Sequence, residues 1–266
     1  MIKAAVIGSP ITHSLSPKIH KKAYEILELE ATYEAIEISE SSFQGFYNGL
    51  QLQDTDSHWS GFSLTMPLKE IVLKHCANAD SITTAINSGN TLYRAEDSWQ
   101  VTSTDYLAFQ NLLNVPEGAK VAIIGGGGTA RAAIGALNTK VKAVDVLLRS
   151  ERRLPALIKA APNLTVNALE MSKALDNYDL IIQTTPSGVF DEQVSNTTQA
   201  NGVLLEALYK PWPTKLVERY ADLGGKVISG KELLVEQALY QIELFSSTKF
   251  DFVKMRADLL SLIELD

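Results

Sequence analysis

Lys69 and Asp105 are the two ionisable side chains whose surroundings in the sequence suggest proton chemistry. Lys69 follows a Thr-Met-Pro-Leu turn, and Asp105 follows two hydroxyl residues after a short strand-like run. An ammonium within hydrogen-bond reach of a reacting oxygen can serve as a general acid or base. We therefore interpret Lys69 and Asp105 as candidate catalytic residues, with an ordinary surface ion pair as the alternative.

Hydroxyl and amide side chains gather in short stretches after other predicted strands. In open α/β sheets, ligands bind beyond the carboxyl ends of the strands, so these stretches are candidate binding loops. Ser14, Ser16 and Thr65 carry hydroxyls suited to a carboxylate, whereas Asn90 and Asp105 suit ring hydroxyls. Each motif also has a purely structural interpretation: Ser16 as a helix cap, Thr65 as a strand end and Asn90 as part of a turn.

A glycine-rich turn follows the apolar run Val121 to Ile124 and leads into an alanine-rich segment. Glycines at this position permit a tight turn and let a pyrophosphate approach backbone N–H groups at a helix N-terminus. An alanine stands where the usual fingerprint has its third glycine, and a plain tight turn is the alternative. The predicted dinucleotide-binding residues of this turn are Gly125, Gly126, Gly127, Gly128, Thr129 and Ala130.

The end of the next predicted strand indicates which dinucleotide binds. A cation there would accept the 2′-phosphate of NADP, whereas an acidic residue would bind the ribose hydroxyl of NAD. Arg149 stands at this end, and Arg152 or Arg153 can complete a cationic fork around a phosphate, with Ser150 as a further contact. Asp145 lies too early, inside the strand. We predict NADP; a solvated helix start is the alternative.

Composition and charge exclude several other classes of partner. Acidic residues outnumber basic ones by 31 to 24 and no Lys/Arg-rich run appears, so we expect no nucleic-acid surface. No apolar stretch approaches the roughly 18 residues that span a bilayer, and the N-terminal residues lack the pattern of a signal peptide. With Cys76 as the single cysteine, we expect a cytoplasmic protein that binds a small molecule and no membrane.

The four histidines show no i,i+4 pairing and no Cys/His spacing suited to a metal, so we predict no metal site. They are His13, His20, His58 and His75. His13 lies next to the proposed carboxylate site, where a capping or packing role is at least as well supported as a functional one.

The strands and helices that must position these residues are predicted by alternating strand-like and helix-like patterns in the sequence. The first strand pattern includes Ala4 to Ile7, and Ser16-Pro17 then opens a helix with Ser16 as its expected N-cap. Such alternation predicts α/β units with a mostly parallel sheet. The pattern restarts at Lys120, and a long helical stretch from about Leu233 is expected to return to the first domain. The predicted domains are an α/β substrate domain, residues 1–104 plus 238–266, and a Rossmann-like, doubly wound dinucleotide-binding domain, residues 105–237.

Together and in this order, the motifs resemble those of shikimate dehydrogenases, over nearly the whole chain. The matching stretches are Gly8-Ser9-Pro10-Ile11-Thr12-His13-Ser14-Leu15-Ser16-Pro17, Ser63-Leu64-Thr65-Met66-Pro67-Leu68-Lys69, Asn90-Thr91-Leu92, Ser103-Thr104-Asp105, Gly125 to Gly128, Thr185-Pro186-Ser187-Gly188, Tyr209-Lys210-Pro211-Trp212-Pro213-Thr214 and Gly230-Lys231-Glu232-Leu233-Leu234-Val235-Glu236-Gln237-Ala238. The resemblance implies two domains, with the nucleotide domain inserted into the substrate domain.

The resemblance also implies a role for each matching side chain. Ser14 and Ser16 would hold the carboxylate of shikimate. The implied contacts to the ring hydroxyls are Thr65, Lys69, Asn90, Asp105 and Gln237. Ser63 and Tyr209 are further predicted substrate contacts; Tyr209 would line the cleft near the nicotinamide, with an ordinary core aromatic as the alternative. The implied cofactor contacts beyond the glycine turn and the arginines are Thr185, Pro186 and Gly230.

The implied activity is the reversible NADPH-dependent reduction of 3-dehydroshikimate to shikimate, a step of chorismate and aromatic amino-acid biosynthesis, by a monomer or homodimer. Three positions depart from the pattern: Ser63 and Ser103 stand where asparagine is common, and Leu148 replaces an asparagine. A quinate or amino-shikimate dehydrogenase using NAD and a nucleotide-binding sensor without turnover remain alternatives. Lys69 either transfers the proton or orients the substrate while water carries it.

Overall fold

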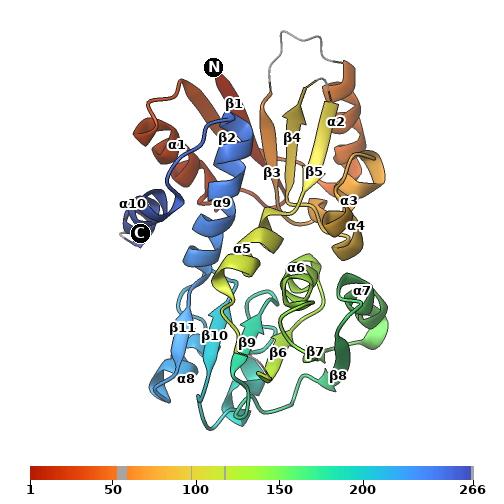
Figure 1. The fold of residues 1–266 in the computed structure, drawn as a ribbon, viewed down its shortest axis with the longest axis vertical. Helices are drawn as coiled ribbons and strands as arrows, with labels where there is room; N and C mark the ends of the chain where they lie inside the picture. Colours follow the sequence, from red (N-terminus) through yellow and green to blue (C-terminus); the bar gives the residue numbers. More distant parts are fainter. Residues whose placement is uncertain (53–58, 97, 117, 265–266) are drawn as a thin grey trace. The chain divides into compact units, whose positions relative to one another are not determined.

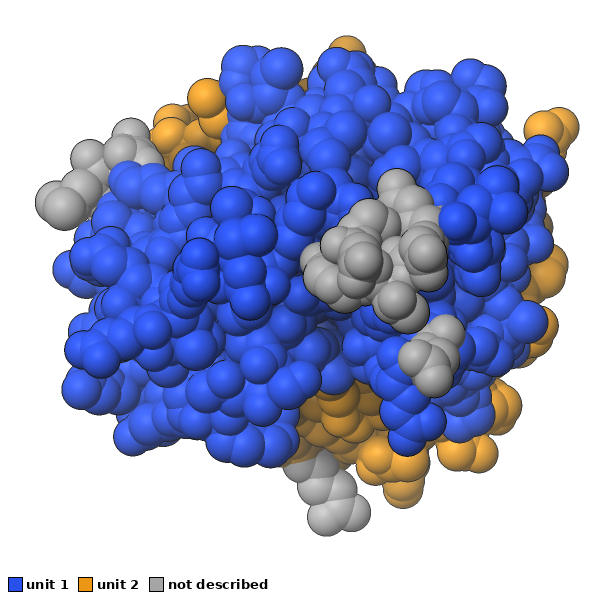
Figure 2. Space-filling model, turned by 90° about the horizontal axis from the view of Figure 1, so that it is seen from above, with its two compact units in different colours: residues 1–104, 235–266 blue, residues 105–234 orange. Residues whose placement is uncertain are grey.

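The chain forms two compact units in a computed structural model that describes residues 1–52, 59–96, 98–116 and 118–264. Unit 1 comprises residues 1–104 and 235–266, and unit 2 comprises residues 105–234 (Figure 2). The chain leaves unit 1 at the start of helix α5, Thr104–Leu112, and returns inside helix α9, Gly230–Ser246. The predicted two-domain α/β class is confirmed.

Unit 1 is built on a five-stranded sheet in the order β2-β1-β3-β4-β5 (Figure 1). The strands are β1 (Ile2–Gly8), β2 (Ala31–Glu37), β3 (Gly61–Leu64), β4 (Thr91–Ala95) and β5 (Ser98–Thr102). β1 pairs in parallel with β2 and β3, whereas β4 runs antiparallel to both of its neighbours. The carboxyl ends of β1, β3 and β5 and the start of β4 therefore share one edge, which we call the unit 1 edge.

Helices cover both faces of this sheet. On one face, α2 (Glu40–Leu52) and α3 (Leu68–His75) pack with the sheet in a core that includes Phe43, Phe62 and Leu92. On the other face, α9 approaches β3 so closely that a Cβ at Gly61 would lie 2.2 Å from the Phe245 ring. The remaining helices of unit 1 are α1 (Ser16–Ile26), α4 (Ser81–Ile86) and α10 (Phe252–Glu264).

Two details of the helices differ from the sequence prediction. Ser16 is the first residue of α1, the N-cap position belongs to Leu15, and no side chain caps the helix; Ser14 Oγ accepts a bond from the Ser16 N–H instead (3.3 Å). Pro17 lies in the first turn as predicted, where its missing N–H costs nothing. The long C-terminal helical stretch is two helices, because the chain turns at Ser247, a residue with φ of 53°.

Unit 2 contains a six-stranded, fully parallel sheet in the order β11-β10-β9-β6-β7-β8. The strands are β6 (Val121–Ile124), β7 (Ala143–Leu148), β8 (Thr165–Glu170), β9 (Leu180–Gln183), β10 (Val203–Glu206) and β11 (Lys226–Ile228). The chain runs outward from β6 through β8 and then returns to the other side of β6 as β9. Ligands of doubly wound sheets bind at the carboxyl edge of this reversal point, between β6 and β9.

Strand β8 was missed by the sequence prediction, since none of its six residues is buried and its apolar residues do not form a continuous run. The helices of unit 2 are α6 (Gly128–Leu137), α7 (Leu154–Ala160) and α8 (Lys215–Asp222), with short 3-10 helices η1 (Glu151–Arg153) and η2 (Asp191–Asn196). Residues of η2 and α8 pack on β6, β9 and β10 in a core with Phe190, Leu204 and Tyr220. In the described part of the chain, no helix is both long and apolar enough to cross a membrane.

Candidate active site

The predicted substrate-binding side chains of unit 1 lie along the unit 1 edge. Ser14 and Ser16 follow β1, Thr65 and Lys69 follow β3, and Asn90 immediately precedes β4. Backbone bonds hold these loops together: the Leu64 N–H donates to the Asn90 carbonyl (2.7 Å), and the Gly89 N–H donates to the Lys69 carbonyl (2.8 Å). The edge thus gathers hydroxyl, amide and ammonium groups from distant segments.

Asn90 and Gln237 are brought into direct contact, as two members of the predicted site. The Asn90 amide nitrogen donates to Gln237 Oε1 (3.1 Å) and to Thr104 Oγ1 (2.9 Å), while Asn90 Oδ1 accepts the Thr104 backbone N–H (2.6 Å). All three residues are buried. Because α9 carries Gln237, the last part of the chain completes this edge of the sheet.

Gln241, one turn after Gln237 on α9, sets the direction of a second set of hydrogen bonds. Its Nε2 donates to the Asn90 carbonyl (3.2 Å) and to Thr91 Oγ1 (3.0 Å). A carbonyl oxygen can only accept, so the amide orientation is fixed and Oε1 must face the other way. There it accepts from Ser63 Oγ (2.6 Å) and contacts His20 Nε2 (3.3 Å).

This orientation determines where the protons of Ser63 and His20 lie. The only Ser63 proton points to Gln241, so Tyr33 must donate its own to Ser63 Oγ (2.6 Å). His20 must carry its proton on Nε2, which leaves Nδ1 to accept from Tyr24 Oη (3.4 Å). His20 is fully buried and stacks on Tyr33 with ring centres 4.0 Å apart.

Ser63 is therefore an acceptor toward any ligand at this edge. Its proton is committed to Gln241 and one lone pair accepts from Tyr33, so a single lone pair remains. A ligand hydroxyl can donate to that lone pair, whereas a ligand carboxylate has no proton to give. Ser63 thus offers a ligand one acceptor position and no donor.

The glycine turn of unit 2 lies at the carboxyl end of β6, as predicted. Gly125 has φ of 108°, and a Cβ there would come within 2.7 Å of Thr184 Oγ1, so the turn packs tightly against the loop after β9. A Cβ at Gly127, by contrast, meets no atom within 4 Å. Gly127 is the N-cap of α6, and Gly128, Thr129 and Ala130 form its first turn. This open, N–H-rich helix start is suited to an anion.

Arg149, Ser150 and Arg152 are exposed and follow β7 at the same edge as the glycine turn. Ser150 caps η1 by accepting the Arg152 N–H at 3.4 Å. Arg153 packs against the turn itself, since a Cβ at Gly126 would lie 2.8 Å from Arg153 Cβ. Of the two arginines weighed for the second cation, Arg153 is thus the one whose stem packs against the turn.

Asp145 lies inside β7, as the sequence indicated, and its carboxylate has partners there. It accepts hydrogen bonds from the Tyr178 hydroxyl (2.7 Å) and from the Asn167 amide (2.8 Å). This carboxylate is thereby committed to neighbouring side chains of unit 2. The only acidic candidate for a ribose contact weighed from the sequence therefore has a structural role.

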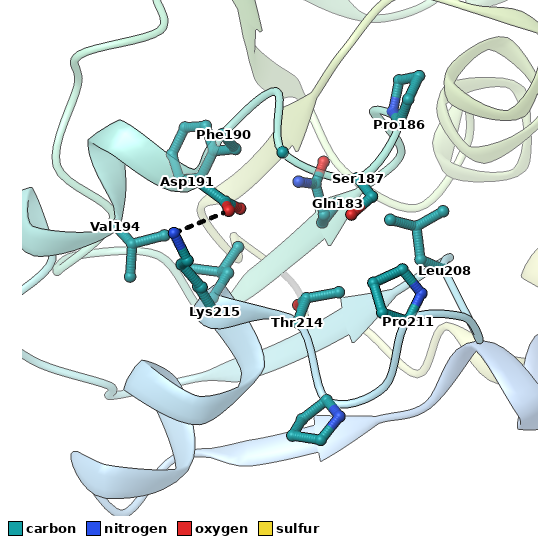
Figure 3. A pocket seen from close by; sticks show the side chains of 13 residues that line it. Gln183, Pro186, Ser187, Phe190, Asp191, Val194, Leu208, Pro211, Thr214 and Lys215 are labelled. Atoms are coloured by element: carbon teal, nitrogen blue, oxygen red, sulfur yellow. Dashed lines mark ion pairs between the residues drawn. The ribbon is translucent and has the colours of Figure 1, made fainter.

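Two loops of unit 2 flank a cavity of about 170 Å³ near the ends of β9 and β10 (Figure 3). The loop after β9 contributes Pro186, and the loop after β10 contributes Leu208 and Pro211. An ion pair between Asp191 and Lys215 (3.1 Å) lies to one side. The predicted contacts Thr185 and Tyr209 belong to the same two loops, and Gly230 packs against the Leu208 carbonyl.

Lys69 belongs to unit 1 and Asp105 to unit 2, and the pairing of their side chains stays a prediction. Within the described ranges, no group of three or more His, Cys, Asp or Glu side chains could hold a metal ion. His58 lies outside the described residues. His13 is exposed, whereas His20 is in the core.

Three residues that organise the unit 1 edge were not predicted from the sequence: His20, Tyr33 and Gln241. One signal was available, because Gln237 and Gln241 are four residues apart and so share one face of a helix. Two amides on one face of a helix, among apolar neighbours such as Ala238 and Ile242, indicate a polar partner inside the protein. The partners themselves lie about 150 to 220 residues away in sequence, beyond any local pattern.

Comparison with known proteins identifies the family. A model of the shikimate dehydrogenase substrate binding domain matches residues 6–92. The crystal structure of Mycobacterium tuberculosis shikimate dehydrogenase is 30% identical in sequence, with a TM-score of 0.87 and coverage of 100% of both chains. This chain belongs to the shikimate dehydrogenase family. The resemblance read from the sequence motifs is confirmed.

Other members of the shikimate dehydrogenase family are similar along both units. The NADP(+) shikimate dehydrogenase of Staphylococcus epidermidis is 28% identical over 266 residues, which cover 96% of this chain and 95% of that relative. The Thermus thermophilus shikimate 5-dehydrogenase, solved in complex with NADP(H) and shikimate, is 26% identical with a TM-score of 0.83 and covers 98% of this chain. The likeness is thus not limited to one unit.

The buried His20 should make stability depend on pH. Burial lowers the pKa of His20 to about 3 from its usual 6.5. Between these two pH values, His20 is therefore protonated in the unfolded chain and neutral in the folded chain. The contribution of His20 to the free energy of unfolding should therefore fall as pH falls from 6.5, by up to ~1.4 kcal/mol per pH unit, whereas the buried carboxyl of Glu206, whose pKa is raised to about 7, contributes in the opposite sense. Urea denaturation from pH 5.0 to 7.5 measures the slope.

His20→Gln should remove this contribution, so its slope should differ from that of the wild type, while the new side chain keeps a donor for Gln241, even if it lowers stability at every pH. His13→Gln, a change of an exposed histidine, is the control and should retain the wild-type slope. Equal slopes in wild type and His20→Gln would show that His20 is not the group responsible.

Proposed function

We propose that this chain catalyses the reversible NADPH-dependent reduction of 3-dehydroshikimate to shikimate. The observation that carries the proposal is the convergence at the unit 1 edge of Ser14, Ser16, Thr65, Lys69 and the Asn90–Gln237 pair. These groups are complementary to a small ring that bears one carboxylate and several hydroxyls. The membership in the shikimate dehydrogenase family supports the same substrate.

In this proposal the hydroxyls of Ser14 and Ser16 hold the substrate carboxylate, and the amides of Asn90 and Gln237 bind ring hydroxyls. Asn90 is fixed by its bonds to Thr104, so it enters the reaction already oriented. Pre-formed hydrogen bonds reduce the entropy lost when the substrate binds. Ser63 contributes an acceptor for one ring hydroxyl.

The residues of unit 2 fit a dinucleotide. The space beside Gly127 and the free N–H groups at the start of α6 suit a pyrophosphate, and Arg149 with Arg153 suits the 2′-phosphate of NADP. Thr185, Pro186, Tyr209 and Gly230 are the proposed contacts near the nicotinamide. When bound, the cofactor supplies the hydride for the ring ketone.

Lys69 is the proposed acid. Hydride addition leaves negative charge on the ring oxygen, and an ammonium at hydrogen-bond distance stabilises that charge and delivers a proton. Asp105 is the second proposed catalytic residue. We further propose that the enzyme acts in the cytoplasm, in the pathway to chorismate, as a monomer or homodimer. Its one cysteine, Cys76, is buried and has no second cysteine with which to form an internal disulfide, as is common in proteins of a reducing compartment.

The activity is tested by offering the purified protein shikimate or quinate, each with NADP or NAD, and following nicotinamide absorbance. We expect turnover with shikimate and NADP. Lys69→Ala should lower kcat by ~100- to 10,000-fold because the proton donor is lost, while shikimate still binds. Lys74→Ala, an exposed lysine on the same helix, is the control and should retain activity. A strong preference for quinate with NAD would contradict the proposal.

Gly127→Ala tests the phosphate site without disturbing the fold. Gly127 has φ of −80°, which alanine adopts, and the new methyl group meets no protein atom, so the melting temperature should fall only by the small preference of an N-cap for glycine over alanine. The methyl group would instead occupy the space proposed for the pyrophosphate and weaken NADP binding by at least ~10-fold, as measured by calorimetry. Gly45→Ala, which also meets no atom within 4 Å, is the control. Unchanged NADP affinity in Gly127→Ala would place the pyrophosphate elsewhere.

Arg149→Leu tests the choice of NADP over NAD. Loss of a charge-assisted bond of about 1.5–3 kcal/mol should raise the KM for NADP by ~10- to 100-fold and leave the KM for NAD nearly unchanged. Arg153→Leu, compared with Arg152→Leu, identifies the second cation. Lys159→Leu, an exposed cation on α7, is the control. Equal effects on both cofactors would rule out a 2′-phosphate contact at Arg149.

A further inference from the structure

Glu206, at the carboxyl end of β10, is a fully buried carboxylate with no role in the chemistry proposed above. Both of its oxygens accept hydrogen bonds. The Leu208 backbone N–H donates to Oε1 at 3.0 Å, and the Thr214 hydroxyl donates to Oε2 at 2.8 Å. Burial raises the pKa of Glu206 to about 7, which shows that its charge is costly here.

The two donors are the two ends of one loop. Leu208 begins the segment that carries Tyr209 and Pro211, and Thr214 ends it as the N-cap of α8, where Thr214 Oγ1 accepts the Val217 N–H (3.3 Å). Because Thr214 accepts from Val217, its own proton is available for Glu206. One carboxylate thus fastens both ends of the loop to the end of β10.

The neighbouring strand carries a similar arrangement. Gln183 lies opposite Glu206 in the β9–β10 register, and its Oε1 accepts both the backbone N–H (2.9 Å) and the hydroxyl (3.0 Å) of Thr185. The two strand-end side chains therefore each hold the loop that follows their own strand. These loops form opposite walls of the cavity in Figure 3 and carry Thr185, Pro186 and Tyr209.

We propose that Glu206 is a positioning residue for the cofactor: by holding Leu208 and Thr214 together, it fixes the loop that presents Tyr209 to the nicotinamide. This inference rests on the proposed NADP-dependent function. Glu206 is buried and acts through the loop rather than by touching the ligand. An apolar residue would fill the same volume at less cost but would leave the Leu208 N–H and the Thr214 hydroxyl without this shared acceptor.

The test compares Glu206→Gln with Glu206→Ala. Glutamine keeps an oxygen for Leu208 and can donate to Thr214 Oγ1, so it should preserve the loop, whereas alanine removes both bonds. Glu218→Ala, which removes an exposed carboxylate from α8, is the matched control. The readouts are amide hydrogen exchange at Leu208 and Val217, the Kd for NADP by calorimetry, and KM and kcat with shikimate.

In Glu206→Ala we expect exchange at Leu208 to accelerate at least ~10-fold relative to Leu204 in the strand, and Kd and KM for NADP to rise ~10-fold or more. The kcat at saturating NADP should stay within ~3-fold. Glu206→Gln and Glu218→Ala should match the wild type. If Glu206→Ala retained wild-type NADP affinity, or if Glu206→Gln were as damaged as Glu206→Ala, the proposal would be overturned.

A second pair of variants covers the case in which Glu206→Ala folds poorly. Thr214→Val removes one of the two bonds to Glu206, while Thr214→Ser keeps it, and only the valine variant should weaken NADP binding. The failure of the proposed function would look different. A wild-type protein that binds NADP but does not oxidise shikimate would refute the activity alone. The proposal for Glu206 would still be decided by amide hydrogen exchange at Leu208 and by the Kd for NADP.

Discussion

The hydrogen bond from Gln241 Nε2 to the Asn90 carbonyl is the constraint on which the substrate side of this protein depends. It joins a helix near the end of the chain to the edge of a sheet formed by the first hundred residues. Since the carbonyl can only accept, this bond orients the Gln241 amide, and the amide in turn orients the protons of Ser63, Tyr33 and His20. One backbone oxygen thereby determines the donors and acceptors of a buried network.

The same bond explains why the polypeptide returns to unit 1 after forming unit 2. Gln237 lies one helical turn before Gln241, so fixing the second amide also brings the first against Asn90. Rotation of α9 about its axis would break the hydrogen bonds of both amides and leave their buried partners unsatisfied, each at a cost of about 1–3 kcal/mol. Close packing of Phe245 on Gly61 adds a steric limit at the far end of the contact. Polar and apolar contacts together therefore specify a single register for α9.

Local patterns in the sequence were sufficient for the α/β class, the glycine turn and the restart near Lys120. These features depend on residues close in sequence, such as four glycines between an apolar strand and an alanine-rich helix. Strand β8 was missed because none of its residues is buried, so it lacks the continuous apolar run that marks the central strands β6 and β9. The antiparallel course of β4 was also missed, since direction follows from long-range pairing rather than from composition.

The candidate site shows the same limit at the level of single residues. Ser63 was correctly placed at a strand end, but its residue type did not reveal that Tyr33 and Gln241 use its proton and one lone pair. Likewise, nothing local distinguishes Glu206 from the many acidic residues that face water. Residue identity gives the hydrogen bonds a side chain can make, and only the fold decides how many of them remain for a ligand.

The side chains that hold the binding loops in place differ in charge between the two units. In unit 1 the network is neutral above the low pKa of His20, so its donors and acceptors keep the same direction over the ordinary pH range. In unit 2, two side chains hold the loops after β9 and β10. One is a neutral amide, Gln183, and the other is an ionisable carboxylate, Glu206. A carboxylate accepts two bonds from two separate donors without presenting a donor of its own, and the loop after β10 offers two donors. The loop after β10, which offers a donor near each of its ends, is thus held by one side chain with two acceptor oxygens.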